Sequence, residues 1–157
     1  MHYYVDGYNF LFRICNRGAP LEMRRESLID ILNRELRFLK GRCSLIFDSA
    51  QQIRDCPQCA FLDNLEVVYT PRGMTADAYI IELVDQSRTP KMLTVVTSDT
   101  GLARQCRSLG AHVTAIEAFI TLIIKKTSIE EEEKPTQELS DRELERLRKI
   151  FEKRLDS

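Results

Sequence analysis

Four aspartates stand where the sequence predicts the ends of strands or the start of a helix. Asp6, Asp48 and Asp99 each follow an apolar, strand-like run, and Asp77 stands at the start of a helical pattern. In an open parallel sheet, ligands bind outside the carboxyl ends of the strands. We therefore expect these four carboxylates, which come from distant parts of the chain, to converge at one edge of a sheet.

Carboxylates gathered in a cleft raise one another's pKa and repel unless a cation compensates them. The cations that best suit carboxylate oxygens are Mg²⁺ and Mn²⁺, which also leave positions open for phosphate. Such a site is suited to the hydrolysis of phosphodiesters. A single aspartate at a strand end is, however, commonly a helix cap, and Asp99-Thr100-Gly101 has that pattern. Four acids at one edge favour the metal site.

Further polar groups accompany the aspartates. Gly7 permits a tight turn after Asp6, and Asn9 is placed either to hydrogen-bond a carboxylate or to cap a helix. Thr97 and Ser98 precede Asp99 and offer hydroxyl groups to a phosphate or to that carboxylate. Ser98 is also a candidate cap.

Short β-rich runs alternate with helical patterns over residues 1–127, which predicts βαβ units and a parallel sheet. The expected strands are His2–Val5, Cys43–Phe47, Leu65–Tyr69, Met92–Thr97 and His112–Ala115. The expected helices are Leu21–Leu39, Ala76–Val84, Leu102–Leu109 and Glu117–Lys125. The fold class is therefore α/β, a three-layer sandwich of the Rossmann-like kind with a central parallel sheet of about five strands.

The chain changes character after residue 127. Residues 128–138 include four consecutive glutamates and predict a solvated acidic linker. Residues 139–157 predict an amphipathic C-terminal helix, because Ser140 and Glu143 form a capping box ahead of an apolar stripe. We expect this helix to pack on the domain of residues 1–127 or to dock on a partner.

The net charge of −1 conceals an uneven distribution. Residues 128–157 carry 10 acidic and 7 basic side chains, whereas residues 1–127 carry 14 acidic and 16 basic ones, of which 12 are arginines. Arginine suits bidentate contacts with phosphate. No apolar stretch approaches the roughly 20 residues of a membrane span, and no secretory signal precedes Asp6. We therefore expect a cytoplasmic protein.

Five cysteines in such a chain favour reduced thiols over a disulfide framework. Cys56 and Cys59 have metal-ligand spacing, but no second pair of ligands with such spacing accompanies them. A zinc knuckle or a redox pair stays open, and the simpler expectation is an exposed loop with two free thiols.

Several of these segments occur together in one known family. Val5-Asp6-Gly7-Tyr8-Asn9, Phe47-Asp48-Ser49-Ala50, Thr75-Ala76-Asp77-Ala78-Tyr79-Ile80 and Thr97-Ser98-Asp99 stand in the order and spacing of the NYN domain and closely resemble its YacP-like branch. The resemblance covers about residues 1–127, and the terminal helix after the linker also resembles that branch.

The resemblance implies a PIN-like ribonuclease fold with an acidic site for a divalent metal. Asp6, Asp77 and Asp99 match the acidic positions of the family, Asn9 matches its polar partner, and Asp48 matches the aspartate of the second strand. The branch includes a bacterial endoribonuclease that cleaves messenger RNA on the translating ribosome. The resemblance therefore also implies RNA as the substrate and the ribosome as a further partner.

The leading hypothesis is a metal-dependent endoribonuclease. Asp6, Asp77 and Asp99 hold Mg²⁺ or Mn²⁺, Asn9 and Asp48 support them, and RNA phosphate is contacted by Arg72, Thr97 and Ser98. Arg72 is assigned by its place in the loop before Asp77, and a solvated loop arginine is the alternative.

Two other classes of protein are alternatives to the nuclease. A catalytically silent RNA- or ribosome-binding adaptor would keep the fold and use its terminal helix as a docking element; four retained acids argue against it. A phospho-accepting receiver domain would need an aspartate after the third strand and a lysine after the fifth, and the chain has Thr70 and Ile116 there. The receiver reading is rejected.

Overall fold

The fold is built on one mixed sheet, seen in a computed structural model that describes residues 1–14, 18–48, 57–132, 145–146 and 149. Its six strands lie in the order β3-β4-β2-β1-β5-β6. They span His2–Asp6 (β1), Arg42–Phe47 (β2), Gln58–Phe61 (β3), Glu66–Tyr69 (β4), Leu93–Val96 (β5) and His112–Thr114 (β6). All neighbours pair in parallel except β3, which runs antiparallel to β4 at the edge.

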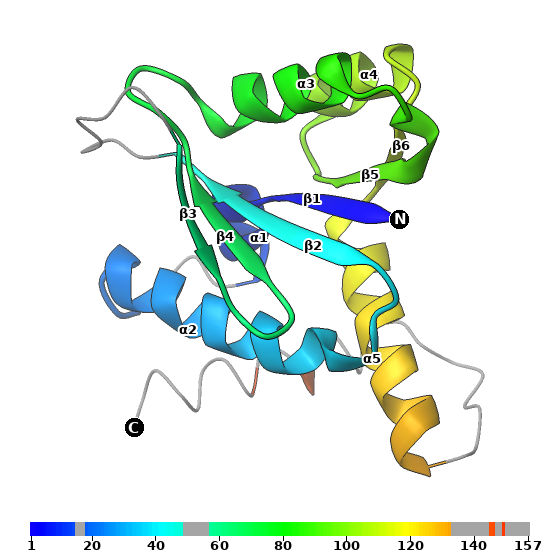
Figure 1. Cartoon of the computed structure of the whole chain (residues 1–157). Helices are drawn as coiled ribbons and strands as arrows, with labels where there is room; N and C mark the ends of the chain where they lie inside the picture. Colours follow the sequence, from blue (N-terminus) through cyan, green and yellow to red (C-terminus); the bar gives the residue numbers. More distant parts are fainter. Residues whose placement is uncertain (15–17, 49–56, 133–144, 147–148, 150–157) are drawn as a thin grey trace.

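Helices cover both faces of the sheet. They are Gly7–Ile14 (α1), Leu21–Glu35 (α2), Ala76–Gln86 (α3), Thr100–Ser108 (α4) and Ile116–Glu132 (α5), with short 3-10 turns at Leu36–Phe38 (η1) and Pro90–Met92 (η2). In Figure 1, α3 and α4 lie above the sheet, and α1, α2 and α5 lie on its other side. No helix in the described ranges is long and apolar enough to cross a membrane.

The core has two halves, because alternate residues of a strand point to opposite faces of the sheet. In β2, Leu45 and Phe47 pack on the side of α1, α2 and α5, whereas Ile46 packs on the side of α3 and α4. The four central strands, β4, β2, β1 and β5, thus contribute apolar side chains to both faces, as a sheet covered on both sides requires.

This architecture confirms the expected α/β class and all five expected strands, within a few residues at their ends. Two elements were missed. Helix α1 follows β1 without a loop, and its eight residues begin with glycine, a poor helix former. Strand β3 is a short exposed edge strand with little apolar alternation, so the expectation that Cys59 lies in a loop was wrong.

Helix α5 is longer than the expected Glu117–Lys125, since it continues to Glu132. It therefore enters the segment expected to be an acidic linker. The remainder of that linker, most of the expected C-terminal helix, and Cys56 lie outside the described residues.

Gly7 allows the direct turn from β1 into α1. A Cβ atom at this position would lie 2.5 Å from Phe47 Cδ1 and 2.7 Å from the carbonyl oxygen of Ile46. The first turn of α1 therefore rests against the end of β2, and any larger residue would force the two apart. This contact sets where Asp6 and Asn9, on either side of Gly7, are placed.

We predict that Gly7→Ala lowers the free energy of unfolding by about 2–3 kcal/mol, because the new methyl group overpacks a site with no free space. Urea denaturation measures this loss. Gly101→Ala is the control, since Gly101 lies in a helix with ordinary backbone angles and the nearest atom to its added Cβ is a side-chain oxygen at 3.2 Å; its stability should change by less than about 1 kcal/mol. Equal stability of Gly7→Ala and the wild type would contradict this assignment.

Candidate active site

The order of the strands creates a crevice beside β1. The chain passes from β1 to β2 and β4 on one side, and then returns to β5 and β6 on the other. At such a switch point the connections leave in opposite directions, which opens a space at the carboxyl ends of the strands. Asp6 ends β1, and residues 97–99 follow β5 directly, so both flank this space.

Asp6 is the most buried of the four aspartates, with 7% of its surface exposed. Burial, followed by the charges of Asp77 and Asp48, raises the pKa of this carboxyl to about 7, and Asp99 adds to the same effect. A hydrogen bond from the Thr97 hydroxyl lowers it, but at 3.4 Å that bond is long. The protein thus holds a carboxyl group that resists ionisation near neutral pH.

Asp77 lies on the first turn of α3, where Thr75 caps the helix by accepting a hydrogen bond from the Ala78 N–H at 3.1 Å. Burial and the charges of Asp99 and Asp48 raise the pKa of Asp77, which lies within hydrogen-bonding reach of Asp6 and Asp99. Two ionised carboxylates cannot hydrogen-bond each other, because both only accept. A proton or a cation between them would therefore stabilise their close approach.

Asp48 is exposed at the end of β2 and accepts a hydrogen bond from the Ala76 N–H. Ala76 is the first residue of α3, whose initial N–H groups have no partner within the helix. Asp48 therefore ties the end of β2 to the helix that carries Asp77. Its contribution is to position that helix as well as to add negative charge.

Asp99 caps α4. Its Oδ1 accepts hydrogen bonds from the N–H groups of Gly101 at 2.8 Å and Leu102 at 3.1 Å. The capping role predicted for Asp99 is thus confirmed. Asp99 is also part of the acidic cluster, since its charge raises the pKa of Asp6 and Asp77. Both bonds use Oδ1, so the other oxygen of this carboxylate is left for further interactions.

Asn9 braces the loop after β5, because its Oδ1 accepts a hydrogen bond from the Ser98 N–H at 2.8 Å. This bond orients the amide, since only an oxygen can accept there, and it leaves the Nδ2 group as a donor. The Thr97 hydroxyl lies 3.3 Å from the same oxygen and accepts from the Asp99 N–H at 3.1 Å. Asn9 and Thr97 thus hold the loop that carries Ser98 and Asp99.

Asn9, Thr97 and the four aspartates are therefore brought together. Arg72 lies on an exposed turn between β4 and α3, closed by the Thr70 hydroxyl bonded to the Met74 carbonyl at 2.7 Å. This turn is at the carboxyl edge of the sheet.

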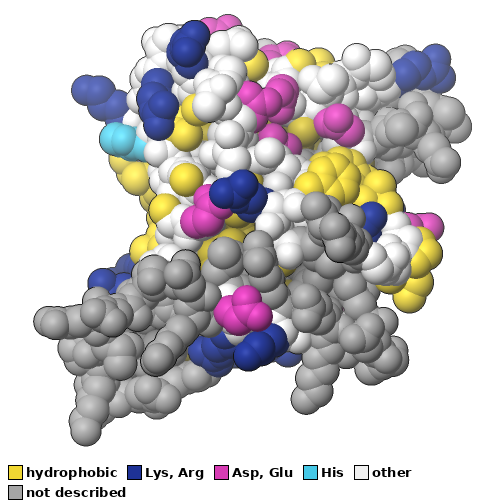
Figure 2. Space-filling model, turned by 180° about the vertical axis from the view of Figure 1, so that it is seen from behind, with side chains coloured by type: hydrophobic (Ala, Val, Ile, Leu, Met, Phe, Trp, Pro, Cys, Tyr) yellow, Lys and Arg dark blue, Asp and Glu magenta, His cyan; other side chains and the backbone are white. Residues whose placement is uncertain are grey.

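Two arginines on α4, Arg104 and Arg107, were not among the expected site residues. A cleft of about 530 Å³ beside Asp99 is lined by Arg104 and Arg107 as well as by Thr97 and Ser98. Their spacing of three residues on a helix that begins at a candidate site residue is the signal that could have identified them. Figure 2 shows Lys and Arg side chains on the side of the molecule where α4 lies, and acidic side chains next to them.

The donor set fits a hard divalent cation. Its oxygens come from carboxylates and an amide, and among the described residues none of the four aspartates has a Lys or Arg ion-pair partner. No three acidic, His or Cys side chains in the described ranges surround one point closely enough to form a ready-made metal cage. Mg²⁺ does not require one, because it commonly binds one or two carboxylates and keeps several water ligands.

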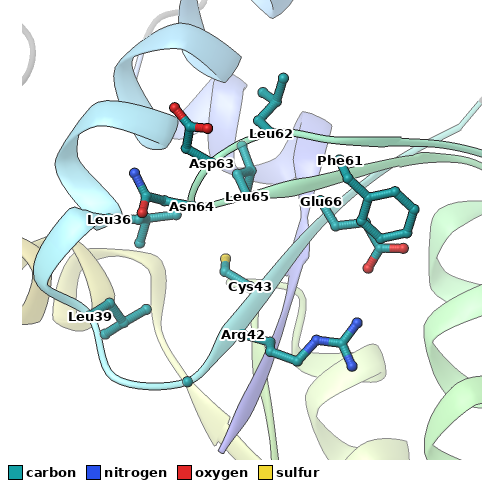
Figure 3. A pocket seen from close by; sticks show the side chains of 11 residues that line it. Leu36, Leu39, Arg42, Cys43, Phe61, Leu62, Asp63, Asn64, Leu65 and Glu66 are labelled. Atoms are coloured by element: carbon teal, nitrogen blue, oxygen red, sulfur yellow. The ribbon is translucent and has the colours of Figure 1, made fainter.

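A second cavity lies at the opposite edge of the sheet. It has a volume of about 220 Å³ and is bordered by η1, the start of β2 and the β3–β4 hairpin (Figure 3). Leu36, Leu39 and Phe61 give it an apolar part, and Arg42 and Glu66 a charged one. None of the four aspartates lines it.

The mostly parallel sheet between two helical layers, with acids at its switch point, agrees with the PIN-like fold that the resemblance implied. A family profile described as the YacP-like NYN domain matches residues 3–156. The chain belongs to this family, which is PIN-like and consists in general of nucleases.

Two solved structures resemble the chain over almost its whole length. Both are of Rae1 (YacP) from Bacillus subtilis. A mutant form is 20% identical with a TM-score of 0.64, covering 99% of this chain and 98% of that one. The other is 19% identical with a TM-score of 0.59, covering 98% and 83%. At this identity the likeness shows the fold. A search of curated proteins found no match.

We predict that Asp6→Asn raises the thermal unfolding midpoint at pH 8 in EDTA by at least about 5 °C. The pKa of Asp6 is about 7 when folded, against an ordinary 3.8. The unfolded chain therefore ionises first as pH rises, so stability falls between these values and the full penalty is present above pH 7. At pH 5 the gain should be smaller.

Calorimetric scans across this pH range measure the effect. Asp85→Asn, an exposed aspartate at the far end of α3, is the control and should show no such pH-dependent gain. An unfolding midpoint for Asp6→Asn below that of the wild type at pH 8 would refute the view that the ionised Asp6 carboxylate destabilises the fold.

Proposed function

We propose that this protein is a divalent-metal-dependent endoribonuclease that hydrolyses phosphodiester bonds of RNA. The observation that carries the proposal is the convergence of four aspartates without an ion-pair partner in the described residues, one of them buried with a pKa near 7. Membership of a PIN-like family supports it. A fold that concentrates negative charge in this way is destabilised unless a cation or protons compensate.

Asp6, Asp77 and Asp99 are the residues that would hold Mg²⁺ or Mn²⁺. When bound, such an ion polarises phosphoryl oxygens and activates water. Asp48 supports the site through its bond to the start of α3, and Asn9 through its bond to the Ser98 N–H.

The side chains around the acids are donors suited to phosphate. The Nδ2 group of Asn9 and the hydroxyl of Ser98 can hydrogen-bond phosphoryl oxygens, and the Thr97 hydroxyl orients the Asp6 carboxyl. Arg72, on its exposed turn, is proposed to contact an RNA phosphate. These groups fix the position of the phosphate and carry no base specificity.

The proposed substrate is messenger RNA in the cytoplasm, either free or presented by the ribosome. Labelled RNA and translating ribosomes, incubated with the protein with and without Mn²⁺, distinguish the two. Cleavage on ribosomes alone assigns the ribosome as the presenting partner, and cleavage of free RNA shows that it is not required.

A second candidate function is an RNA- or ribosome-binding adaptor without catalysis. It is favoured by one observation: Asp48 and Asp99 already serve as structural acceptors for helix N-termini. In an adaptor these two would be retained for folding. The charges on Asp6 and Asp77 would then have no role.

We predict that Asp77→Asn reduces metal-dependent RNA cleavage by at least about 100-fold, because it removes a direct metal ligand. The measurement is the rate of cleavage of a labelled RNA in Mn²⁺. Asp85→Asn changes the same helix by the same chemistry at its exposed far end and should cleave at the wild-type rate. Wild-type activity of Asp77→Asn would exclude the proposed site.

We also predict that Mn²⁺ binds the wild type in the millimolar range or below and binds Asp6→Asn at least tenfold more weakly. Isothermal titration calorimetry measures both affinities without requiring activity. Metal should also raise the unfolding midpoint of the wild type, since it binds the folded state. An absence of binding at millimolar Mn²⁺ would support the adaptor instead.

A further inference from the structure

The cleft beside α4 opens directly from the acidic cluster. It shares Thr97, Ser98 and Asp99 with the candidate active site, and it continues along α4 to Arg104 and Arg107. Its volume of about 530 Å³ lies in the range of cavities that hold small organic ligands, which is room for a nucleotide. Any chain bound at the aspartates therefore has a formed path along this helix.

Arg104 and Arg107 are exposed, and neither has an acidic partner among the described residues. Residues three apart lie on the same side of a helix, so the two guanidinium groups serve the same cleft. Two other arginines of the domain are engaged: Arg13 pairs with Glu117, and Arg25 donates to the Tyr8 hydroxyl at 3.0 Å. The charges of Arg104 and Arg107 are thus available to a ligand.

The chemistry of the cleft selects an anion with several oxygens. Guanidinium groups bind phosphate in a bidentate fashion, and the hydroxyls of Ser98 and Thr100 add donors. The free N–H groups at the start of α4 do not supply the site, because Asp99 already accepts from two of them. The arginines must therefore carry the affinity.

We propose that this cleft binds the RNA backbone next to the cleaved phosphodiester, with Arg104 and Arg107 contacting its phosphates. This inference rests on the proposed endoribonuclease function and assigns the side of the active site on which the substrate strand runs. Contacts of this kind position the strand and are independent of base sequence.

The test measures binding separately from cleavage. Fluorescence anisotropy of a labelled single-stranded RNA is followed with Asp77→Asn protein, which binds without cutting, over a range of salt concentrations. Adding Arg104→Gln and Arg107→Gln should weaken binding at least tenfold and reduce the slope of log affinity against log salt by about 1.4, since each phosphate contact on a single strand contributes about 0.7. Arg104→Lys with Arg107→Lys should keep the slope and lose part of the affinity.

The control removes the same charge elsewhere. Arg88 and Lys91 are exposed between α3 and β5, at the opposite edge of the sheet. Arg88→Gln with Lys91→Gln should change the affinity less than twofold and leave the slope unchanged. Because all four residues are exposed, circular dichroism should show equal folding for both double variants.

Two results would overturn the inference. One is an unchanged salt slope in the Arg104 and Arg107 variant; the other is an equal loss in the Arg88 and Lys91 variant, which would show a diffuse charge effect. If either result is found and the wild-type protein, without Asp77→Asn, cleaves RNA in Mn²⁺, only the assignment of the cleft is wrong. If the wild-type protein neither binds nor cleaves RNA, the proposed function fails as well.

Discussion

Repulsion among carboxylates at the end of β1 is the constraint on which the arrangement of this protein depends. Asp6 is buried, and its carboxyl faces the charges of three other aspartates, so its pKa rises to about 7. Repulsion among these carboxylates lowers the stability of the fold. The cluster is present because the fold brings four separate chain segments to one crevice, and a cation or protons must balance it.

The same aspartates also help to assemble the crevice. Asp48 accepts from the first residue of α3, and Asp99 accepts from the first turn of α4. Both helices therefore point their N-terminal ends, which carry partial positive charge, toward the cluster. The same side chains therefore accept hydrogen bonds from helix N-termini and add negative charge to the cluster.

Charge is divided sharply around this edge of the domain. The acids lie at the switch point, while Arg104 and Arg107 of α4 lie along the adjoining cleft. A phosphodiester chain carries negative charge and would be repelled by the acids alone. An RNA-acting site therefore needs both parts, with cations against the acids and guanidinium groups along the strand. The net charge of −1 is the sum of these opposing regions and an acidic C-terminal segment.

Local pattern determined much of this protein. Apolar runs of strand length, each followed by an aspartate, placed Asp6, Asp48 and Asp99 at strand ends, and a helical pattern placed Asp77 on a first turn. These features are readable because periodicity and capping depend on residues close in sequence. Helix α1 was not readable, since its start is set by the contact of Gly7 with Phe47, far along the chain.

Only the tertiary structure decided what these residues touch. The orientation of Asn9 depends on the Ser98 N–H, 89 residues away, and the importance of Arg104 and Arg107 depends on a cleft formed with β5 and β6. The strand order creates both the Asn9 contact and the cleft, because β1 lies between β2 and β5. The sequence alone determined which chemical groups would reach the edge of the sheet. Which of them became neighbours depended on non-local strand pairing, which no local pattern encodes.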